Sequence, residues 1–377
     1  MQALISAYAR SPFHFARKGA LAAVRPDTLA AQMVQGLLAR TGLDPALLDD
    51  VILGVAYPEA AQGNNLARIV GLLAGLPQSV GGMTINRFCG SSMSAIQIAA
   101  AQIEAGIGEA YLCVGVESMS MVPQGGFNFS PNPVLLAETD SYIGMGMTAE
   151  NVAARNHVSR RDQEALAVES HRKAANAREW GRFDAEIVPI DTGDGNFVTV
   201  DGCIRPGTNL EALAALKPAF LESGVVTAGT SSPLTDGASA VLVTSEAFAH
   251  RHGLAPLARI RAVATIGCDP ALMGIGPVPA TQLVLKRAGL TVADLDVVEI
   301  NEAFAAQALA CIGELGLDPA TINLDGGGLA IGHPLGATGA RITGKAASLL
   351  QRENGRYALA TQCIGGGQGI ATILEAL

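Results

Sequence analysis

The 377-residue chain is poor in aromatic and charged residues. Aromatic side chains make up 4% of it, with a single tryptophan, and charged side chains make up 16%. No apolar run reaches the roughly 18 residues that a membrane span needs, which argues against a membrane-spanning protein. Hydrophobic residues, in contrast, make up 49%, and there are 44 glycines. This balance is typical of an α/β enzyme of two or three domains with a large core and tight turns.

Positive charge is also scarce, because the formal net charge is −9. A general nucleic-acid-binding protein is therefore not expected. One local exception lies in residues 155–182, which contain seven Arg and Lys residues but only four acidic residues. Such a cluster is either an ordinary solvated helix face or a contact surface for an anionic substrate.

The six cysteines form no C-x-x-C pair and show no spacing typical of metal ligands. In a chain of this length they indicate reduced, intracellular thiols. The first residues, MQALISAYAR, already predict a strand, and no signal peptide precedes them. We therefore expect a cytoplasmic protein without a targeting segment.

The last third of the chain resembles the first at an offset of 246 residues. This offset aligns Gly336 with Gly90 and Tyr357 with Tyr111. Each half then follows the order helix, strand, turn, apolar helix, strand, which predicts two similar α/β units. The first half is interrupted at about residues 120–235, and we expect this insert to form a lid or binding subdomain.

Cys89 stands between the predicted strand GMTIN and the apolar helix SSMSAIQIAAAQIEAG. Ser91 and Ser92 are suitable capping residues for this helix, and Gly106 can end it. A thiol at a helix N-terminus is expected to have a lowered pKa, which favours a nucleophilic thiolate. The alternative is a buried, inert cysteine, which is the commoner fate of this residue type.

His333 lies in GGGLAIGHPLGATGAR, directly before a second apolar helix. The 246-residue offset places it two residues before Cys89, so the two halves present these side chains at equivalent corners. If the halves face each other, His333 can act as a general base for the thiol. The glycines do not indicate a nucleotide-binding loop, because the stretch lacks a Walker Lys-Ser/Thr pair and a clean G-x-G-x-x-G.

Two further polar residues end predicted strands. Cys363 closes the strand YALATQC before IGGGQG, whose N–H groups can face an oxyanion. It is either an acid–base group for a carbon acid next to a thioester or a buried strand-end cysteine. Asn301 follows the strand VVEI, where it either holds a water or oxyanion or merely caps the next helix.

Together these segments resemble the thiolase family over essentially the whole chain. The matching motifs occur in the family's order and are NRFCGSSM, GVESMS, GMTAEN, VTAGTSSPLTDGA, GCDPALMGIGPVPA, NEAFAAQ, GGGLAIGHPLGATGAR and CIGGGQG. The resemblance implies a five-layered αβαβα fold of two duplicated halves. We expect an N-terminal half of residues 1–119 and 236–255, an inserted loop domain of 120–235, and a C-terminal half of 256–377.

The resemblance also implies catalytic roles. Cys89 would be the nucleophile that carries the acyl group, and His333 would activate it and help to form an oxyanion hole. Asn301 would hold the water that completes this hole. Cys363 would be the general acid and base at the α-carbon, and the N–H groups of Cys89 and Gly365 would stabilise the tetrahedral intermediate.

Substrate-binding roles follow in the same way. Met145 and Met273 would line the reacting acyl group, Phe304 the pocket wall, and Ser232 the pantetheine arm. The basic cluster of the insert would meet the 3′-phospho-ADP end of coenzyme A. Coenzyme A would be a substrate, and no resident cofactor or metal is expected.

The motifs CGSSM, GTSSPLTDGA and GCDPALMGIGPVPA look more like degradative 3-ketoacyl-CoA thiolases of β-oxidation than biosynthetic acetoacetyl-CoA thiolases, which are the second interpretation. A decarboxylating ketoacyl synthase would use two histidines where this chain has Cys–His–Cys. The sequence also leaves open a non-catalytic acyl-CoA-binding protein and a thiol redox sensor. The family is typically dimeric or tetrameric, so we expect a homo-oligomer, with a β-oxidation multienzyme subunit as a further possible partner.

Overall fold

Two halves of one large β-sheet organise the computed structural model, which describes residues 2–377. The first half has the strand order β4 (Met83–Ile85), β3 (Asp50–Gly54), β5 (Ala110–Ser118), β8 (Thr235–Ser245) and β1 (Ala3–Arg10). The second half continues with β9 (Ala258–Gly267), β12 (Gln368–Glu375), β11 (Tyr357–Ile364) and β10 (Val297–Ile300). The short β2 (His14–Phe15) pairs with β8 off this path. Only two residue pairs, Leu4 with Arg259 and Ile5 with Ala258, join the halves.

The pairing pattern is the same in both halves. β3 is parallel to β5 and β10 is parallel to β11, whereas β8 and β12 run antiparallel to these neighbours. The parallel strands are buried almost throughout, as expected for strands covered by helices on both faces. The structure therefore contains the two similar α/β units that the sequence repeat predicted.

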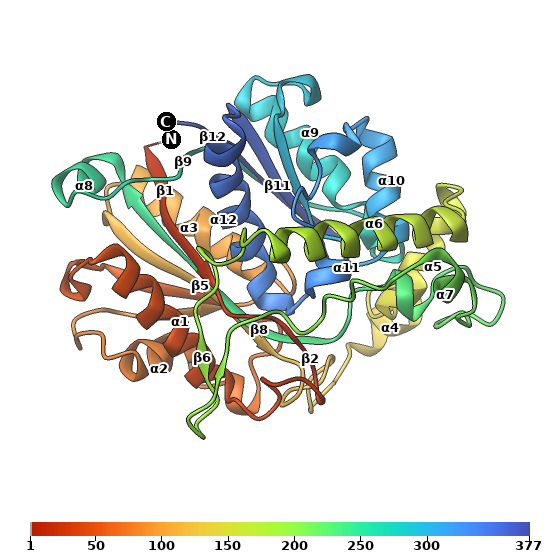
Figure 1. Ribbon diagram of the computed structural model, residues 1–377, viewed down its shortest axis with the longest axis horizontal. Helices are drawn as coiled ribbons and strands as arrows, with labels where there is room; N and C mark the ends of the chain where they lie inside the picture. Colours follow the sequence, from red (N-terminus) through yellow and green to blue (C-terminus); the bar gives the residue numbers. More distant parts are fainter. Residues whose placement is uncertain (1) are drawn as a thin grey trace.

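Helices complete five layers around these strands (Figure 1). α3 (Ser91–Glu104) and α12 (Leu335–Glu353) lie between the halves, where they pack against strands of both and share one apolar core. α1 (Pro26–Thr41) and α2 (Leu66–Leu73) cover the outer face of the first half. α9 (Pro277–Ala288) and α10 (Ala305–Leu315) cover that of the second half. This is the αβαβα fold that the sequence motifs implied.

The central helices α3 and α12 approach each other unusually closely. A Cβ atom on Gly339 would lie only 2.3 Å from the backbone nitrogen of Met93, so this crossing requires a glycine. The Ser92 hydroxyl accepts a hydrogen bond from the backbone N–H of Ala340 at 2.8 Å. The helices therefore cross near their N-terminal turns, which brings the segments that precede both helices into one region.

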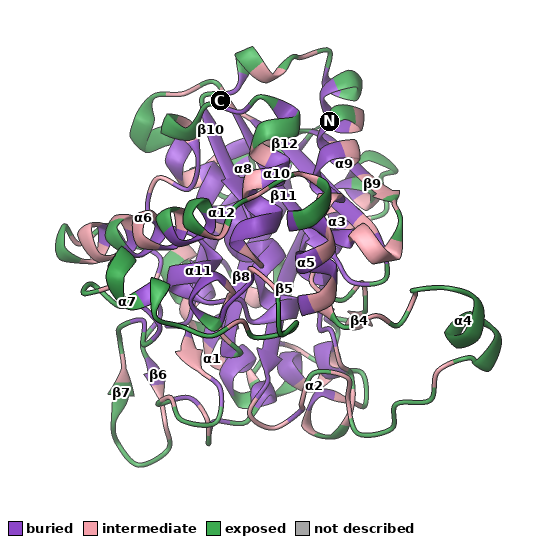
Figure 2. Cartoon of the chain, turned by 90° about the vertical axis from the view of Figure 1, so that its right-hand side faces the viewer, coloured by how far each residue is buried: buried purple, intermediate pink, exposed green. Residues whose placement is uncertain are grey.

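A long segment connects β5 to β8. It contains α4 (Pro133–Glu138), α5 (Met145–Arg155), α6 (Arg160–Glu179), the hairpin of β6 (Ile190–Asp191) and β7 (Phe197–Val198), and α7 (Leu210–Ala214). α6 packs against α10 and the short α11 (Gly328–Ile331), whereas α4 and its flanking chain project from the body (Figure 2). α8 (Glu246–Arg251) follows β8. The exact domain boundaries given above stay predictions.

The basic cluster of residues 155–182 begins at the last residue of α5 and continues through α6. Ser159 begins the second helix, because its side chain accepts a hydrogen bond from the N–H of Asp162. Among residues 2–377, no helix combines the length and the apolar character needed to cross a bilayer.

Candidate active site

Cys89 lies in the tight turn that connects β4 to α3. Phe88 adopts a left-handed conformation with φ of 44°, which costs a non-glycine residue about 1–3 kcal/mol. Side chains hold this turn: Asn86 accepts from the N–H of Phe88 at 2.7 Å, and Ser91 accepts from the N–H of Arg87 at 2.8 Å. The helix N-cap is Gly90, without a side-chain cap. The prediction that a serine is the N-cap of α3 is therefore wrong, since Ser91 closes the preceding turn instead, but both serines do lie in the first turn of the helix.

Cys363 approaches Cys89 from the other half. It is the last but one residue of β11 and is buried. The Gln362 side chain beside it donates a hydrogen bond to the Cys89 carbonyl, and the backbone N–H of Gly365 bonds the Cys89 sulfur. A negative charge on Cys89 raises the pKa of Cys363, although burial raises it more. The structure thus brings the two cysteines, 274 positions apart, together as free thiols.

His333 and Asn301 also meet. Asn301 directly follows β10, and its amide nitrogen lies 3.3 Å from Nε2 of His333. Asn301 does not cap the following helix, because α10 has Phe304 at its N-cap. Of the two roles that the sequence left open for Asn301, the structure thus supports a position beside the histidine.

Thr338, on the first turn of α12, contacts the other ring nitrogen of His333. Its hydroxyl lies 2.6 Å from Nδ1 and 3.3 Å from the carbonyl oxygen of Pro334. A hydroxyl has one proton, so donation to Pro334 leaves a lone pair that accepts Nδ1–H. This arrangement leaves the lone pair of His333 on Nε2, where the Asn301 amide can donate. Sequence reasoning missed Thr338; the only signal was a polar residue five positions after the histidine.

The segment of His333 packs against the turn of Cys89. Leu335, two residues after the histidine, belongs to the same apolar cluster as Cys89, Ala56 and Met119. The backbone N–H of His333 donates to the Thr235 hydroxyl at 3.1 Å, at the start of β8. The crossing of α3 and α12 therefore places the predicted nucleophile and the predicted base in adjoining segments.

The electrostatics differ from the sequence-based expectation for Cys89. Burial raises the pKa of the Cys89 thiol to about 12, and the N–H groups of Gly365 and Cys89 itself only partly oppose this. The predicted lowering of this pKa is therefore wrong, because desolvation outweighs the helix N-terminus. Burial, aided by the charge of Arg341, lowers the pKa of His333 to about 3. At neutral pH the site holds a thiol and a neutral imidazole, not an ion pair.

An apolar wall surrounds Cys363. Met273 and Ala303 are buried against it, and Met145 and Phe304 pack partly buried beside them. Phe304 also makes an edge-to-face contact with Phe220, at 5.9 Å between ring centroids. Ser232 joins this wall through its backbone, because its N–H donates to the Ala303 carbonyl at 3.0 Å. The four residues predicted to bind substrate are thus neighbours of one another.

Part of the basic cluster in residues 155–182 is neutralised internally. Arg160 pairs with Glu164, Arg172 with Glu169 and Arg182 with Asp325. Within residues 2–377, no ion pair engages Arg155, Arg161 or Arg178. Lys173 also forms no ion pair within the described residues, but its ammonium group donates to the Ile322 carbonyl at 2.8 Å. A contact with an anionic ligand would therefore fall mainly to the three arginines.

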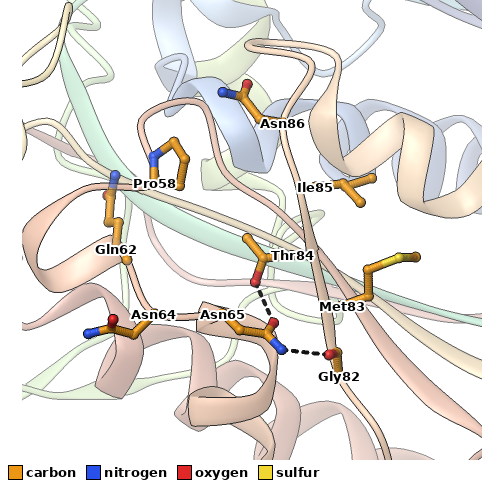
Figure 3. Close-up of a pocket in the computed structure, with 10 residues that line it drawn as sticks. Pro58, Gln62, Asn64, Asn65, Gly82, Met83, Thr84, Ile85 and Asn86 are labelled. Atoms are coloured by element: carbon orange, nitrogen blue, oxygen red, sulfur yellow. Dashed lines mark hydrogen bonds between the residues drawn. The ribbon is translucent and has the colours of Figure 1, made fainter. Parts of the chain in front are cut away.

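A separate surface cavity of about 470 Å³ lies along the sheet edge at β4 (Figure 3). Asn65 crosses its floor, where it donates to the Gly82 carbonyl and accepts from the Thr84 hydroxyl, both at 2.9 Å. The cavity is lined by none of the predicted site residues. Residues 2–377 also contain no group of three His, Cys, Asp or Glu side chains that could hold a metal ion.

Comparisons with known proteins agree with this fold. Family models described as the thiolase N-terminal domain and the thiolase C-terminal domain match residues 3–247 and 254–376. Proteins named 3-ketoacyl-CoA thiolase from Shewanella denitrificans and Saccharophagus degradans are each 48% identical, over 99% and 98% of this chain and 99% and 96% of theirs. The crystal structure of human mitochondrial 3-ketoacyl-CoA thiolase in complex with CoA superposes with a TM-score of 0.92 at 39% identity, covering 100% of this chain and 98% of that one.

Proposed function

The chain belongs to the thiolase family, and we propose that it cleaves 3-oxoacyl-CoA with free CoA into acetyl-CoA and a shortened acyl-CoA. It is an acyltransferase, and the full-length similarity to proteins named 3-ketoacyl-CoA thiolase supports this direction of the reaction. The observation that carries the proposal is that Cys363 lies near Cys89, that Asn301 contacts His333, and that the segments of His333 and Cys89 share one apolar cluster.

In the first half-reaction, Cys89 attacks the 3-keto carbon of the substrate. Because the thiol is protonated at rest, its proton moves to neutral His333 as the carbon–sulfur bond forms. The tetrahedral alkoxide then collapses and breaks the C2–C3 bond, leaving the acyl group on Cys89. The bonding electrons pass to the acetyl-CoA fragment as an enolate.

The enolate oxygen needs fixed donors, since a bare enolate is too basic to form at neutral pH. Protonated His333 and a water held by Asn301 would supply them. The Cys363 thiol would protonate C2 of the enolate and so release acetyl-CoA. In the second half-reaction, the resulting Cys363 thiolate would take the proton of CoA, whose sulfur attacks the acyl group. Protonated His333 would return its proton to the departing Cys89 sulfur, which restores the resting thiol and the neutral imidazole.

The apolar cluster around Cys363 would suit an acyl chain and a thioester. Met145, Met273 and Phe304 would offer an apolar wall to the acyl group. Ser232, whose N–H donates to Ala303 of this wall, would contact the pantetheine arm. Arg155, Arg161 and Arg178 are the unpaired cations that would meet the phosphates of CoA. The predicted loop domain of residues 120–235 supplies Ser232, Met145 and these three arginines.

The test is a thiolysis assay over a C4-to-C16 series of 3-oxoacyl-CoA substrates, with Cys89→Ala and Cys363→Ala beside the unmodified chain. We expect Cys89→Ala to abolish thiolysis. Cys363→Ala should still take an acetyl group from acetyl-CoA onto Cys89 but should not condense two acetyl-CoA molecules. Normal condensation by Cys363→Ala would overturn its assigned role.

The same assay separates this function from its rivals. Biosynthetic condensation of two acetyl-CoA is the reverse path, and activity restricted to the C4 substrate would favour it. Binding of acyl-CoA without turnover would favour a non-catalytic protein. A homodimeric or homotetrameric state, a cytoplasmic location and a β-oxidation partner subunit remain predictions, which sedimentation and co-purification can test.

A further inference from the structure

One buried carboxylate beside the candidate nucleophile has no part in the chemistry above. Glu117 belongs to the GVESMS motif, stands next to the end of β5, and is completely buried. Its negative charge contributes to raising the pKa of Cys89, so it lies close enough to influence the thiol. Burying a charge costs free energy, and this charge also disfavours the thiolate, so other interactions must compensate for its burial.

Four hydrogen bonds to Glu117 provide this compensation. One carboxylate oxygen accepts the backbone N–H of Ala56 at 2.8 Å and that of Gly336 at 2.9 Å. The other accepts the side-chain amide of Gln62 at 2.8 Å and the N–H of Tyr57 at 3.3 Å. All four donors therefore converge on one carboxylate, which is the pattern that keeps a buried carboxylate ionised even though burial raises its pKa.

These donors belong to different halves of the molecule. Ala56, Tyr57 and Gln62 follow β3 in the first half, whereas Gly336 is in the first turn of α12 in the second half. The start of α12 rests directly on the first half, because a Cβ on Gly336 would lie 2.7 Å from the Cα of Val55. Glu117 therefore bridges the two halves at the point where α12 begins.

α12 lacks a cap of its own. Its N-cap residue is Pro334, which forms no side-chain cap hydrogen bond. A carboxylate at the N-terminal turn satisfies a free N–H group and interacts favourably with the helix dipole. Glu117 thus caps α12 from β5. The N–H group that it accepts belongs to Gly336, three residues after His333.

The sequence repeat relates Glu117 to a residue of the candidate active site. The offset of 246 residues aligns Glu117 with Cys363, and β5 pairs with its neighbours as β11 does. Gln362, next to Cys363, contacts the turn before α3, while Glu117 contacts the first turn of α12. One half therefore has a thiol, and the other a carboxylate, at equivalent strand ends.

We propose that Glu117 is a positioning residue for the thiolase reaction: by capping α12 from the opposite half, it fixes where His333 stands relative to Cys89. The proposal rests on the function proposed above. It implies that the charge of Glu117 costs the site some thiol acidity and that its hydrogen bonds set the alignment on which proton transfer depends.

Two variants separate these effects. Glu117→Gln removes the charge and replaces one acceptor oxygen by a donor, and Glu117→Asp keeps the charge but shortens the reach. Misplacement of a catalytic group by about 1 Å can cost on the order of 100-fold in rate. We therefore expect kcat for thiolysis to fall about 10- to 100-fold in both variants, with KM for CoA within about twofold.

The pH profile of Cys89 alkylation by iodoacetamide distinguishes the variants further. Loss of the negative charge should move its midpoint to lower pH in Glu117→Gln, whereas Glu117→Asp should leave it in place. A Gln variant with a more reactive thiol and slower turnover would show that alignment, not acidity, is what Glu117 supplies. Peptide mass spectrometry identifies the alkylated cysteine.

Asp49→Asn is the matched control. Asp49 accepts the N–H groups of Glu109 at 2.7 Å and Ala110 at 2.9 Å, at the opposite end of β5. This variant should keep kcat, and urea unfolding of all variants separates stability from activity. A kcat within twofold of the unmodified chain in both Glu117 variants, or an equal loss in Asp49→Asn, would overturn the proposal.

A crystal structure of Glu117→Asp tests the positioning role independently of the reaction. We expect the start of α12 and the His333 ring to be displaced relative to Cys89. An unchanged ring position contradicts the proposal even if the chain is an active thiolase. A displaced ring in a chain that cleaves no 3-oxoacyl-CoA supports the positioning role while the proposed function fails.

Discussion

At the scale of single residues, the site depends on how protons are held before substrate arrives. His333 is kept neutral by burial and by the charge of Arg341, and its Nδ1 faces the Thr338 hydroxyl. The tautomer with its lone pair on Nε2 agrees with an Asn301 amide that donates to Nε2 and with a Thr338 hydroxyl that accepts from Nδ1–H. Thr338 therefore prepares the imidazole to receive a proton from a thiol.

Thr338→Val tests this arrangement, because valine keeps the shape of threonine but cannot accept Nδ1–H. We expect kcat for thiolysis to fall about 10-fold or more. Without an acceptor for Nδ1–H, the proton of His333 is no longer held on Nδ1, and general-base catalysis by Nε2, worth about 10²–10⁴-fold, is reduced. Thr338→Ser should retain most of the activity. Steady-state assays of both variants provide the measurement, and a valine variant as active as the unmodified chain would contradict the assignment.

At the residue scale, the sequence indicates positions where the signal is local, while the catalytic roles stay predictions. Cys89, His333, Asn301 and Cys363 each stand at a strand or helix end that the sequence pattern reveals. The sequence shows Glu117 only as part of a motif. Its role could not be predicted, because its four partners come together only in the folded chain. The pKa of Cys89 was predicted in the wrong direction, since burial cannot be read from a neighbouring helix alone.

At the scale of elements, the crossing of α3 and α12 is the critical contact. It depends on Gly339, where α12 meets the backbone of α3. The sequence showed two apolar helices and a repeat, which were enough to predict the layered fold. It did not show which glycines are contact points, because exposed and buried glycines look alike in sequence.

Gly339→Ala and Gly313→Ala form a matched pair for this contact. The first places a Cβ 2.3 Å from the Met93 nitrogen, whereas the second meets nothing within 4 Å on the exposed side of α10. Overpacking typically costs about 1–3 kcal/mol, so Gly339→Ala should destabilise the protein by at least that amount. Gly313→Ala should stabilise it by about 0.5–1 kcal/mol. Urea unfolding measures both; equal effects would argue against the close crossing.

The packing of α6 should respond to pH through His171. This histidine is buried, accepts the N–H of Arg205 at 3.2 Å, and has its pKa lowered by burial to about 4. In the unfolded chain it takes up a proton near pH 6.5, which the fold resists. Its contribution to stability is therefore complete above pH 6.5 and is lost as the pH falls from 6.5 towards 4.

Urea unfolding at pH 7.5 and pH 5.0 checks this sign. We expect the unmodified chain to lose more stability between the two pH values than His171→Asn does. Because other groups also titrate in this window, the difference between the two proteins is the informative quantity. Identical losses would show that His171 is not held neutral in the fold.

At the scale of the whole molecule, buried charges tie the connecting segment to both halves. Asp325 pairs with Lys345 at 2.7 Å, Arg352 at 2.6 Å and Arg182 at 3.2 Å. Lys345 also pairs with Glu186 at 2.9 Å, which in turn holds Arg10 of β1 at 2.7 Å. The network thus links the region after α6, the first strand and the helix α12.

Asp325→Asn should weaken the molecule as a unit. Burial raises the pKa of Asp325, but Lys345 and Arg352 lower it to about 2, so the carboxylate is charged in the fold. Breaking a buried ion pair costs about 3–5 kcal/mol, and we expect a loss of this order in urea unfolding at pH 7. Since the pKa is lowered, this contribution should be lost as the pH falls from about 3.8 towards 2. An unchanged midpoint at pH 7 would contradict the role of the network.

The central claim is that Cys89 carries the acyl group. The most direct measurement is peptide mass spectrometry after mixing the protein with 3-oxohexanoyl-CoA in the absence of free CoA, followed by an acid quench. The account predicts a butyryl group on the peptide that contains Cys89, with acetyl-CoA released into solution. A butyryl group on another cysteine, or acetyl-CoA release without any acylated cysteine, would contradict it.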